Sequence, residues 1–528
     1  MRSLLILIML IIPIKIFADA GLMRPDGKIN RGGKIITAFG VTTKNFDIYQ
    51  GGSFPVMSHM YNSLVRYNLV DGLKTIIPDL ATDWNISDDG LIYTFNLRKG
   101  VKFHDGVEFT ADDVITTFDK KILNAPRNIV SVYKSNFEMV NEIEKTGKYQ
   151  IRFTLKYPTL FFLNVLAAPQ HLILPKHYLE KYNYDLKKQC CAPGTGAFKY
   201  VKYETGERWL YTKNENYWDP ELPYVDELEM LHVPAWSDRG TAILTGRANL
   251  SWNVSSETWD AGKEKEGIEA ALIPNFGAYW VHYNVKKGPL SNKLVRRAIL
   301  LGVNQHNMIN AFSTQERINL TRWTPYGDPY ATPPSVIEKL PGYRKNDKND
   351  ILEAKSLLKE AGYENGIDGL TFLAASGPQA ELLAPAFQEM LRRNLNIKVK
   401  IKLMERAMMR GEVLKGNFDM ALDTQGHSIS DFLPRATIWW KTGGSTNMGG
   451  YSNPELDSII DQMKGITDVH LKHSLVRQAE AILDEDPPWY LVGYTYHLPM
   501  WSSKVKGIDL ANRASAEWGR FETIYIEK

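Results

Sequence analysis

Cysteine is almost absent from this sequence. The 528 residues include two cysteines, Cys190 and Cys191, and these are neighbours. A structural zinc site needs two separated pairs of ligands, so a single adjacent pair is a poor candidate for metal binding. Disulfide geometry normally holds Cα atoms about 5.5 Å apart, whereas a trans peptide bond spaces neighbouring Cα atoms at about 3.8 Å. Free thiols and a strained disulfide between neighbours both fit the sequence.

A surplus of charge of one sign is also missing. The chain carries 63 lysines and arginines against 60 aspartates and glutamates, a formal net charge of +3. No block of five or more like charges occurs. This balance provides no electrostatic attraction for nucleic acid or for an anionic membrane surface. The sequence therefore predicts no nucleic-acid partner.

The motifs of common enzyme classes are missing as well. No Gly-Lys pair is followed by Ser or Thr as a phosphate-binding P-loop requires, and GTGAFK (194–199) lacks the third glycine of a dinucleotide-binding loop. The metalloprotease, serine hydrolase and dithiol motifs do not occur, and the 11 histidines are dispersed without ligand spacing. We therefore expect a protein that is not an enzyme, with no catalytic residues, no cofactor and no metal site.

Long apolar runs are confined to the N-terminus. Arg2 precedes an apolar run over residues 4–12, and residues 18–20 (ADA) provide a small-residue cleavage site before Gly21. The run is shorter than the roughly 20 apolar residues that a membrane-spanning helix needs. Residues 1–20 are therefore predicted to be a cleaved signal peptide, with an N-terminal anchor as the alternative. The absence of cysteine near the cleavage site argues against a lipoprotein anchor, so we expect an exported mature protein that begins near Gly21.

Hydrophobic periodicity predicts an α/β fold. Residues 370–375 (LTFLAA) are typical of a buried strand, and residues 378–394 repeat apolar side chains at helical spacing. Residues 397–403 (IKVKIKL) alternate apolar side chains with lysine, as a strand with one buried face does. Strand, helix and strand in about 35 residues form a crossover between parallel strands. Chain length predicts two or three lobes, and the Pro- and Gly-rich segments 190–198 and 484–490 are candidate crossings between them.

The pair His104 and Asp105, in KGVKFHDGVEFTADDVITTF (99–118), is the one candidate for catalytic chemistry. An aspartate beside a histidine could orient it as a general base. Neighbouring side chains of a strand, however, point to opposite faces. Asp105-Gly106 is typical of a turn, and Thr110 followed by acidic residues is typical of a helix start. We therefore predict a turn and a helix start here.

The segment PDLATDWNISDDGLIYTFNLRKGVKFHDGVEFTADDVITTF (78–118) resembles the signature of the family 5 extracellular solute-binding proteins, the periplasmic dipeptide, oligopeptide and nickel receptors of ABC importers. The likeness continues in order along the chain at PGTGAFKY (193–200), KNENYWDPELPYVDELEM (213–230), VHYNVKKGPLSNKLVRRAI (281–299), EAKSLLKEAGY (353–363) and NMGGYSNPELDSIID (447–461).

The resemblance implies an α/β fold of the type II periplasmic binding proteins, with two large α/β lobes, a two-stranded hinge and a smaller inserted α+β domain. Carried over by motif, lobe I comprises residues 21–65, 192–280 and 492–528, the inserted domain comprises residues 66–191, and lobe II comprises residues 281–491.

The resemblance also implies a function. The chain would be a monomeric receptor that encloses a small peptide, a peptide-like molecule or another polar solute between its lobes. It would then deliver the solute unchanged to an inner-membrane ABC permease. Alternatives are a chemosensory receptor and a receptor for an opine-like conjugate, an oligosaccharide or a metal chelate. An exported hydrolase would need a catalytic motif that the sequence does not contain.

Ligand contacts are expected in segments that correspond to cleft-lining segments of relatives. Aromatic side chains there would form rigid walls and a few polar groups would fix orientation, although each aromatic could equally belong to the core. The expected ligand-binding residues are Phe46, Trp252, Asn253, Tyr279, Trp280, Asp423, Gln425, His427 and Trp440.

One departure from the family concerns the ligand's amino group. Peptide receptors of the family carry a Trp-x-x-Asp segment whose aspartate pairs with that group, and Gln425 and Ser428 occupy the corresponding positions here. A buried ammonium without a carboxylate partner is costly. Asp423 and Asp431 are nearby alternatives, and without one of them the sequence argues against generic peptide binding.

Overall fold

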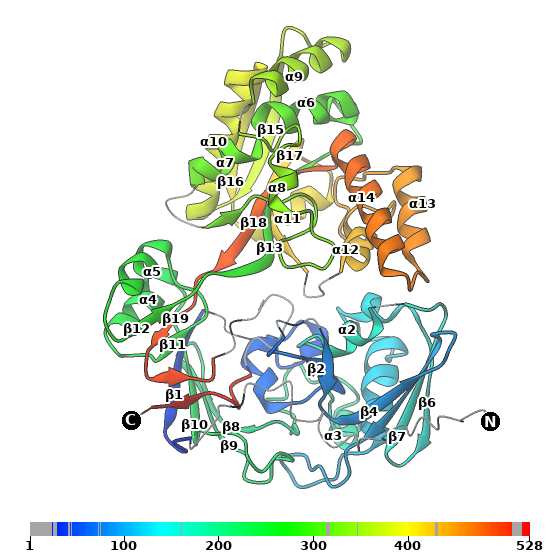
Figure 1. Cartoon of the computed structure of the whole chain (residues 1–528), viewed down its shortest axis with the longest axis vertical. Helices are drawn as coiled ribbons and strands as arrows, with labels where there is room; N and C mark the ends of the chain where they lie inside the picture. The colour runs from blue at the N-terminus through cyan, green and yellow to red at the C-terminus, as the bar shows by residue number, and fades with distance from the viewer. Residues whose placement is uncertain are drawn as a thin grey trace, which may run out of the picture.

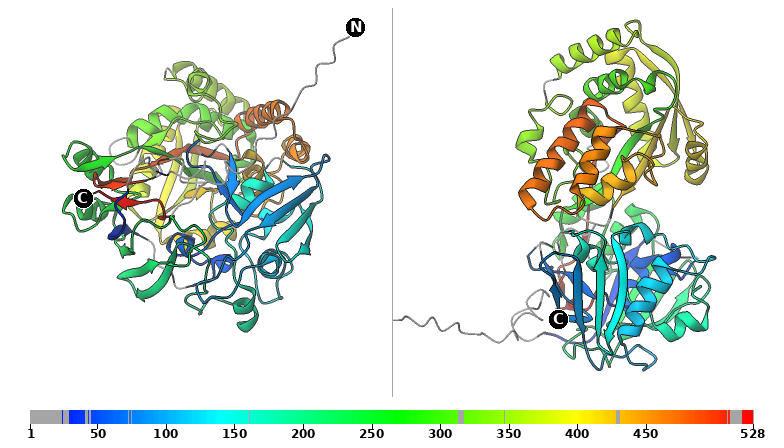
Figure 2. Two further views of the ribbon diagram at one scale, coloured as in Figure 1. Left: turned by 60° about the horizontal axis from the view of Figure 1, so that its bottom comes forward. Right: turned by 90° about the vertical axis from the view of Figure 1, so that its right-hand side faces the viewer.

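The computed structural model describes residues 24, 29–40, 43, 45–71, 73, 75–159, 161–312, 317–345, 347–427, 431–508, 510 and 520–527. Figure 1 shows two bodies stacked along the long axis, and the right-hand view of Figure 2 shows the same two bodies from the side. The predicted signal peptide lies outside the described residues. Among the helices that are described, none has both the length and the apolar character needed to cross a bilayer.

The lower body contains a seven-stranded sheet, which we call lobe I together with helices α4 (Trp236–Leu244) and α5 (Ser256–Lys263) packed on it. The sheet is mixed, because β1 runs parallel to β10 and β11 while the other pairs are antiparallel. In spatial order its strands are β12 (Ile268–Ala270), β19 (Met500–Ser502), β11 (Leu250–Ser251), β1 (Lys34–Phe39), β10 (Glu227–His232), β9 (Arg208–Lys213) and β8 (Phe198–Glu204).

The upper body, which we call lobe II, is built on a six-stranded mixed sheet. In spatial order its strands are β14 (Ile318–Asn319), β18 (Trp489–His497), β13 (Ile273–Tyr283), β17 (Met420–Gly426), β15 (Ile367–Ala375) and β16 (Ile397–Met404). Its helices are α6 (Lys293–Val303), α7 (Gln305–Phe312), α8 (Pro334–Ile337), α9 (Lys348–Glu360), α10 (Pro378–Leu395), α11 (Arg406–Leu414), α12 (Phe432–Trp439), α13 (Pro454–Met463) and α14 (Val469–Glu485).

The predicted crossover is confirmed in lobe II. Strand β15, helix α10 and strand β16 follow one another, and the two strands pair in parallel. Edge strand β16 buries one side chain in two at its start, as its Ile-Lys alternation requires, whereas the central strand β13 is buried throughout Ala278–Tyr283. Helix α10 is 18 residues long and contains Pro385 in its interior, so this proline does not end the helix.

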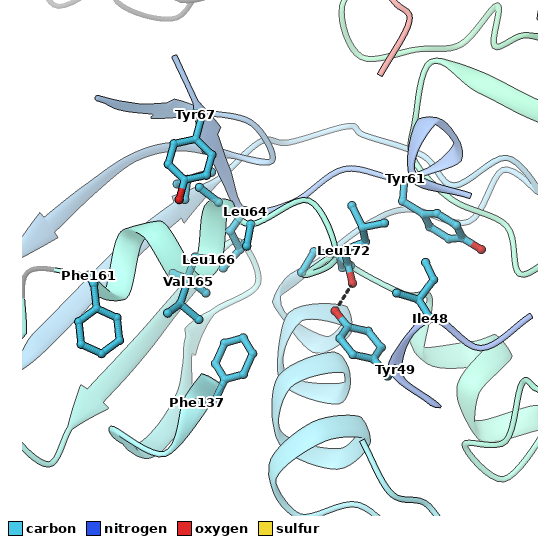
Figure 3. Packing of buried hydrophobic residues seen from close by; sticks show 14 of the residues in the cluster. Ile48, Tyr49, Tyr61, Leu64, Tyr67, Phe137, Phe161, Val165, Leu166 and Leu172 are labelled. Carbon is cyan, nitrogen blue, oxygen red and sulfur yellow. Dashed lines mark hydrogen bonds between the residues drawn. The ribbon is translucent and has the colours of Figure 1, made fainter. Parts of the chain in front are cut away.

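A four-stranded antiparallel sheet lies beside lobe I in the lower body. Its order is β4 (Ala81–Ile86), β5 (Ile92–Leu97), β7 (Gln150–Leu155) and β6 (Val140–Gly147), and the chain around it forms β2 (Val65–Tyr67), β3 (Ile76–Pro78), α1 (Ala111–Ile115), α2 (Phe162–Ala167) and α3 (Lys176–Lys181). Figure 3 shows the buried side chains in this region, including the hydrogen bond of 2.7 Å that the Tyr49 hydroxyl donates to the Leu172 carbonyl.

The predicted turn and helix start in segment 99–118 are confirmed. The Gly106 amide donates to the Phe103 carbonyl, and Thr110 caps α1. His104 does not pair with Asp105: its Nε2 lies 2.9 Å from the Gly196 carbonyl oxygen, and burial lowers its pKa to about 4. Asp105 instead lies 2.7 Å from His177. The side chains of His104 and Asp105 therefore make separate structural contacts in this region.

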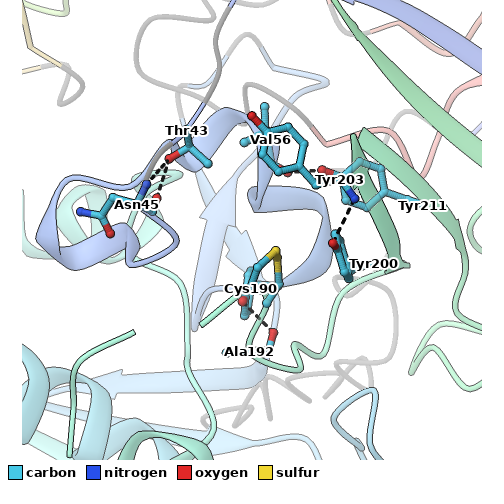
Figure 4. Close-up of a disulfide and its surroundings, with 10 residues drawn as sticks. Thr43, Asn45, Val56, Cys190, Ala192, Tyr200, Tyr203 and Tyr211 are labelled. Atoms are coloured by element: carbon cyan, nitrogen blue, oxygen red, sulfur yellow. Dashed lines mark hydrogen bonds between the residues drawn. A yellow bond between two sulfur atoms is a disulfide. The ribbon is translucent and has the colours of Figure 1, made fainter. Parts of the chain in front are cut away.

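Cys190 and Cys191 form a disulfide in the segment that leads into β8 (Figure 4). The pair packs against the large core of the lower body, and the Tyr61 hydroxyl donates a hydrogen bond of 2.7 Å to the carbonyl of the next residue, Ala192. Of the two states that the sequence leaves open, the structure has the oxidised one.

Two strands connect lobe I with lobe II. β12 of lobe I leads into β13, and β18 leads back into β19 of lobe I. β13 and β18 pair antiparallel from Ile273 opposite His497 to His282 opposite Trp489, and Figure 1 shows them running side by side between the bodies. The lobe limits expected at 280/281 and 491/492 fall within these two strands and stay a prediction.

Candidate functional site

Two adjoining cavities lie where the linking strands leave lobe I. The larger, which we call the hinge cavity, has a volume of about 410 Å³ and the smaller, the side cavity, about 280 Å³. Trp236, Tyr279 and Thr424 border both. The hinge cavity is bordered by both lobes and by β13 and β18, and the side cavity extends along lobe II toward the N-terminal ends of α10 and α11.

An irregularity in β13 shapes the hinge cavity. The register between β13 and β18 shifts between Pro274 and Ala278, which is where a bulge locally interrupts a ladder. The Asn275 side chain compensates for the interruption, because it accepts from the Gly277 amide at 3.0 Å and donates to the Thr495 hydroxyl at 3.0 Å. These two bonds hold β13 beside β18 across the interruption, although the β13 backbone between Pro274 and Ala278 leaves the regular ladder beside the cavity.

Arg239 presents a guanidinium to the hinge cavity. Its three nitrogens donate to backbone carbonyls of Val233, Pro234 and Asn253, at 2.7, 2.7 and 3.4 Å. Burial lowers the pKa of this guanidinium to about 10. Among the residues that the structure describes, no acidic side chain forms an ion pair with it.

Gly40 makes room for this guanidinium. A Cβ atom at position 40 would lie 1.6 Å from Arg239 Nη2, which is inside any allowed contact distance. The position of the guanidinium therefore depends on a glycine that lies 199 positions earlier in the chain.

Asp423 borders the side cavity but its charge is compensated. Arg406 donates to Asp423 Oδ1 from Nε and Nη2, at 3.1 and 2.9 Å, and Arg410 donates to Oδ2 at 2.9 Å. Asp431, the other carboxylate considered for an amino group, lies 2.7 Å from the buried ammonium of Lys472 and caps α12 through the Leu433 amide. Both carboxylates are thus already paired with cations of the chain.

Four of the nine expected ligand-binding residues border these cavities. Asn253 and Gln425 border the hinge cavity, Asp423 borders the side cavity, and Tyr279 borders both. The Gln425 amide oxygen has no hydrogen-bond partner in the described part of the chain. An unpartnered polar atom beside a cavity is suited to binding a solute.

The other five lie elsewhere. Trp280 and Trp440 are fully buried in a cluster of tryptophans with Trp323, Trp439 and Trp489, and the rings of the other four lie 5.4 to 6.3 Å from that of Trp280. The remaining three, Trp252, Phe46 and His427, border neither cavity: Trp252 is 3 % exposed, Phe46 packs edge-on against Tyr203 and Trp209, and the His427 ring lies 6.5 Å from that of Trp439.

Sequence reasoning missed the cationic and part of the aromatic lining, namely Trp236, Arg239, Arg317, Arg406, Tyr496 and His497. One signal could have found Arg406 and Trp236. Each follows closely after a strand, β16 or β10, and solutes of open α/β sheets bind beyond the carboxyl ends of the strands. Arg317 and Arg239 carry no comparable local signal.

A further cavity of about 310 Å³ lies between the four-stranded sheet region and helices α12 and α13. Its border includes Glu138, Tyr157, Phe161, Lys441 and Lys464, and it touches neither lobe I nor the linking strands. The site that both lobes and both linking strands border is therefore the stronger candidate for solute binding. No cluster of three or more potential metal ligands occurs within the described residues.

The chain is similar in sequence and in structure to known binding proteins. A family model described as bacterial extracellular solute-binding proteins, family 5 Middle, matches residues 75–447. The chain is 29% identical over 496 residues to heme-binding protein A of Haemophilus influenzae, covering 87% of this chain and 86% of that one. It is 25% identical over 481 residues to the glutathione-binding protein GsiB of Escherichia coli K12, covering 86% and 88%. The solved structure of the ABC transporter-associated periplasmic binding protein DppA from Helicobacter pylori, in complex with the peptide STSA, has a TM-score of 0.78 and 28% identity and covers 94% of this chain and 99% of that one.

Proposed function

Because this chain belongs to the bacterial extracellular solute-binding proteins of family 5, we propose that it captures a small polar solute between its two lobes for an ABC importer. The resemblance noted in the sequence is confirmed, and so is the fold class of the type II periplasmic binding proteins. The family and the relatives compared above are binding proteins and not enzymes.

The observation that carries the proposal is the position of the hinge cavity. Lobe I, lobe II and both linking strands border it, so rotation of the lobes about β13 and β18 changes its walls. A solute that contacts both lobes stabilises the arrangement in which they lie together, and thereby shifts the population toward the closed form. The closed form is the one that we expect the inner-membrane permease to recognise.

Tyr279, Asn253, Gln425 and Asp423 are the proposed contacts of the solute among the residues expected from the sequence. They come from a linking strand, from lobe I and from lobe II, and they border the cavities directly. Trp252, Trp280, Trp440, Phe46 and His427 border neither cavity and are not among these proposed contacts.

The relatives narrow the class of solute. Their names specify heme, glutathione and a peptide, so we propose a peptide, a peptide-like molecule or another polar solute of similar size for this chain. We further propose that residues 1–20 are removed during export and that the mature receptor acts as a monomer in the periplasm.

Closure around a solute is testable by small-angle scattering. The receptor is isolated from the periplasm, its co-purified ligand is identified by mass spectrometry, and scattering is recorded with ligand removed and restored. We expect a smaller radius of gyration with ligand and recovery of the ligand unchanged. One rigid shape in both samples, or conversion of the ligand to a product, would refute the proposal.

Two matched pairs of variants locate the solute. Tyr279→Ala and Gln425→Ala should abolish or strongly weaken ligand binding. Tyr182 directly follows α3 and Gln462 lies on α13, both away from the two cavities, so Tyr182→Ala and Gln462→Ala should leave binding unchanged.

A further inference from the structure

We propose that the solute is an anion whose carboxylate or phosphate group binds Arg239, and that the site selects against a free ammonium group. This inference rests on the proposed function, since it assigns a charge to the solute of the same site.

More positive than negative side chains border the two cavities. The positive ones are Arg239, Arg317 and Arg406, and the one carboxylate in the lining is that of Asp423. Arg406 and Arg410 both pair with that carboxylate, and Arg317 pairs with Asp260, 2.7 Å away. Arg239 is left as the lining cation without an anionic partner in the described part of the chain. A desolvated cation of this kind favours an anionic solute.

The geometry of Arg239 fits an oxyanion. A guanidinium has five N–H groups in a planar fork, and three of them account for the hydrogen bonds to the backbone carbonyls. One N–H on each terminal nitrogen has no partner among the described residues. Two such groups on one planar fork match the two oxygens of a carboxylate or phosphate.

Among the described residues that border the cavities, a free ammonium finds no uncompensated carboxylate. Asp423 is engaged by two arginines, and Asp431 lies against Lys472 with side-chain exposures of 6% and 1%. Binding an ammonium without such a partner leaves a buried charge uncompensated. The zwitterion of a free peptide would gain contacts at its carboxylate and lose hydration at its amine.

The remaining lining indicates an apolar body attached to the anionic group. Phe39, Trp236, Tyr279 and Tyr496 contribute aromatic surface to the hinge cavity. Aromatic walls with a few convergent polar groups bind molecules that combine an apolar part with a polar end.

Three probes with the same side chains separate the charges. N-acetyl-Ala-Phe is an anion at neutral pH, Ala-Phe is a zwitterion, and Ala-Phe-amide is a cation. Dissociation constants are measured by titration calorimetry on the ligand-free mature protein. We expect the anion to bind most tightly, the zwitterion less tightly and the cation least.

Variants assign this preference to Arg239. Loss of a charge-assisted hydrogen bond should weaken the anion about 10- to 100-fold in Arg239→Gln, with Arg239→Lys recovering part of the loss. Gly40→Ala keeps the arginine but displaces its guanidinium, and should weaken the anion while the fold, followed by circular dichroism, is kept. Arg392→Gln, on the exposed surface of α10, is the control and should have no effect.

A second pair of substitutions tests the selection against ammonium. Arg406→Gln combined with Arg410→Gln frees the carboxylate of Asp423. In this variant the cationic probe should gain affinity relative to the anionic one. An unchanged preference would overturn the role given to the compensated carboxylate.

The proposal is overturned if the cation binds as tightly as the anion, or if Arg239→Gln behaves like Arg392→Gln. If none of the probes binds, the ligand that co-purifies from the periplasm decides: an anion supports the proposal, and a cation or an uncharged ligand overturns it. Closure around a cationic ligand in the scattering experiment would preserve the proposed receptor function while refuting this inference.

Discussion

The buried ion pair between Lys121 and Asp47 allows a quantitative test of how the lower body is held together. Lys121 Nζ lies 2.5 Å from Asp47 Oδ2, and both side chains have an exposure of 0%. Lys121 belongs to the helical segment Thr116–Leu123 beside the four-stranded sheet, whereas Asp47 lies just before the short helix Ile48–Gln50. Burial lowers the pKa of Lys121 although Asp47 opposes this effect, so desolvation of the ammonium is the larger influence.

Lys121→Met keeps most of the side-chain volume and removes the charge. Loss of one partner from a buried ion pair costs about 3–5 kcal/mol, because the remaining charge is left uncompensated. Asp47 keeps hydrogen bonds from the Tyr49 amide, the Gln50 side chain and the Leu186 amide, at 3.1, 2.7 and 3.0 Å. These bonds stabilise the carboxylate, so we expect the lower end, about 3 kcal/mol.

Urea denaturation followed by circular dichroism measures this loss. The control is the neighbouring Lys120→Met, because Lys120 is 54% exposed and its pairing with Asp119 should be worth less than about 1 kcal/mol. The double variant Lys121→Met with Asp47→Asn removes both charges and should lie within about 1 kcal/mol of the wild type. A loss below about 1 kcal/mol in Lys121→Met, or no recovery in the double variant, would refute the reasoning.

Three further predictions concern other parts of the molecule. Burial lowers the pKa of His282 to about 4, so between pH 6.5 and 4 the unfolded chain binds more protons than the folded one and the free energy of unfolding falls as the pH drops. Urea titrations at pH 6.5 and pH 4 should show that His282→Leu loses about 3 kcal/mol less of this free energy than the wild type does. Trp280→Phe should lower the free energy of unfolding by about 1–3 kcal/mol but change the dissociation constant of the ligand less than twofold, because the indole packs in the core. A large loss of affinity would show that the Trp280 indole contacts the solute. Asp260→Asn breaks the partly exposed ion pair with Arg317, which joins α5 of lobe I to lobe II, and should lower the free energy of unfolding by less than about 1 kcal/mol. The radius of gyration of the ligand-free protein should increase in scattering, and an unchanged radius would contradict a role of this pair in holding the lobes together.

Local patterns were sufficient for much of the fold. The alternation in 397–403 and the helical spacing in 378–394 predict β16 and α10 because each depends on neighbours within a few residues. The turn at Asp105-Gly106 and the cap at Thr110 are equally local. The effect of Pro385 is not predictable in this way, since packing of α10 against the sheet and α6 compensates for the missing hydrogen bond.

The site was less predictable because its parts are distant in sequence. Arg239 of α4 becomes a lining cation only where Gly40, directly after β1, leaves space for it. Tyr279 and Trp280 are adjacent and chemically similar, yet one borders the cavities and the other is buried among tryptophans. Neighbouring side chains of a strand point to opposite faces, so alternation separates the two, but only the packing of lobe I and lobe II determines which face of β13 borders the cavities.

The brevity of the two connections limits the way in which the receptor can open. Only residues 271–272 and 498–499 separate the strands of one sheet from those of the other. Two extended residues supply about 7 Å of slack, so these tethers do not allow the halves to drift apart in parallel. The lobes can therefore separate only by hinge rotation, and the distance between them increases with distance from the two connections. Solute would therefore enter and leave at the rim opposite the paired strands.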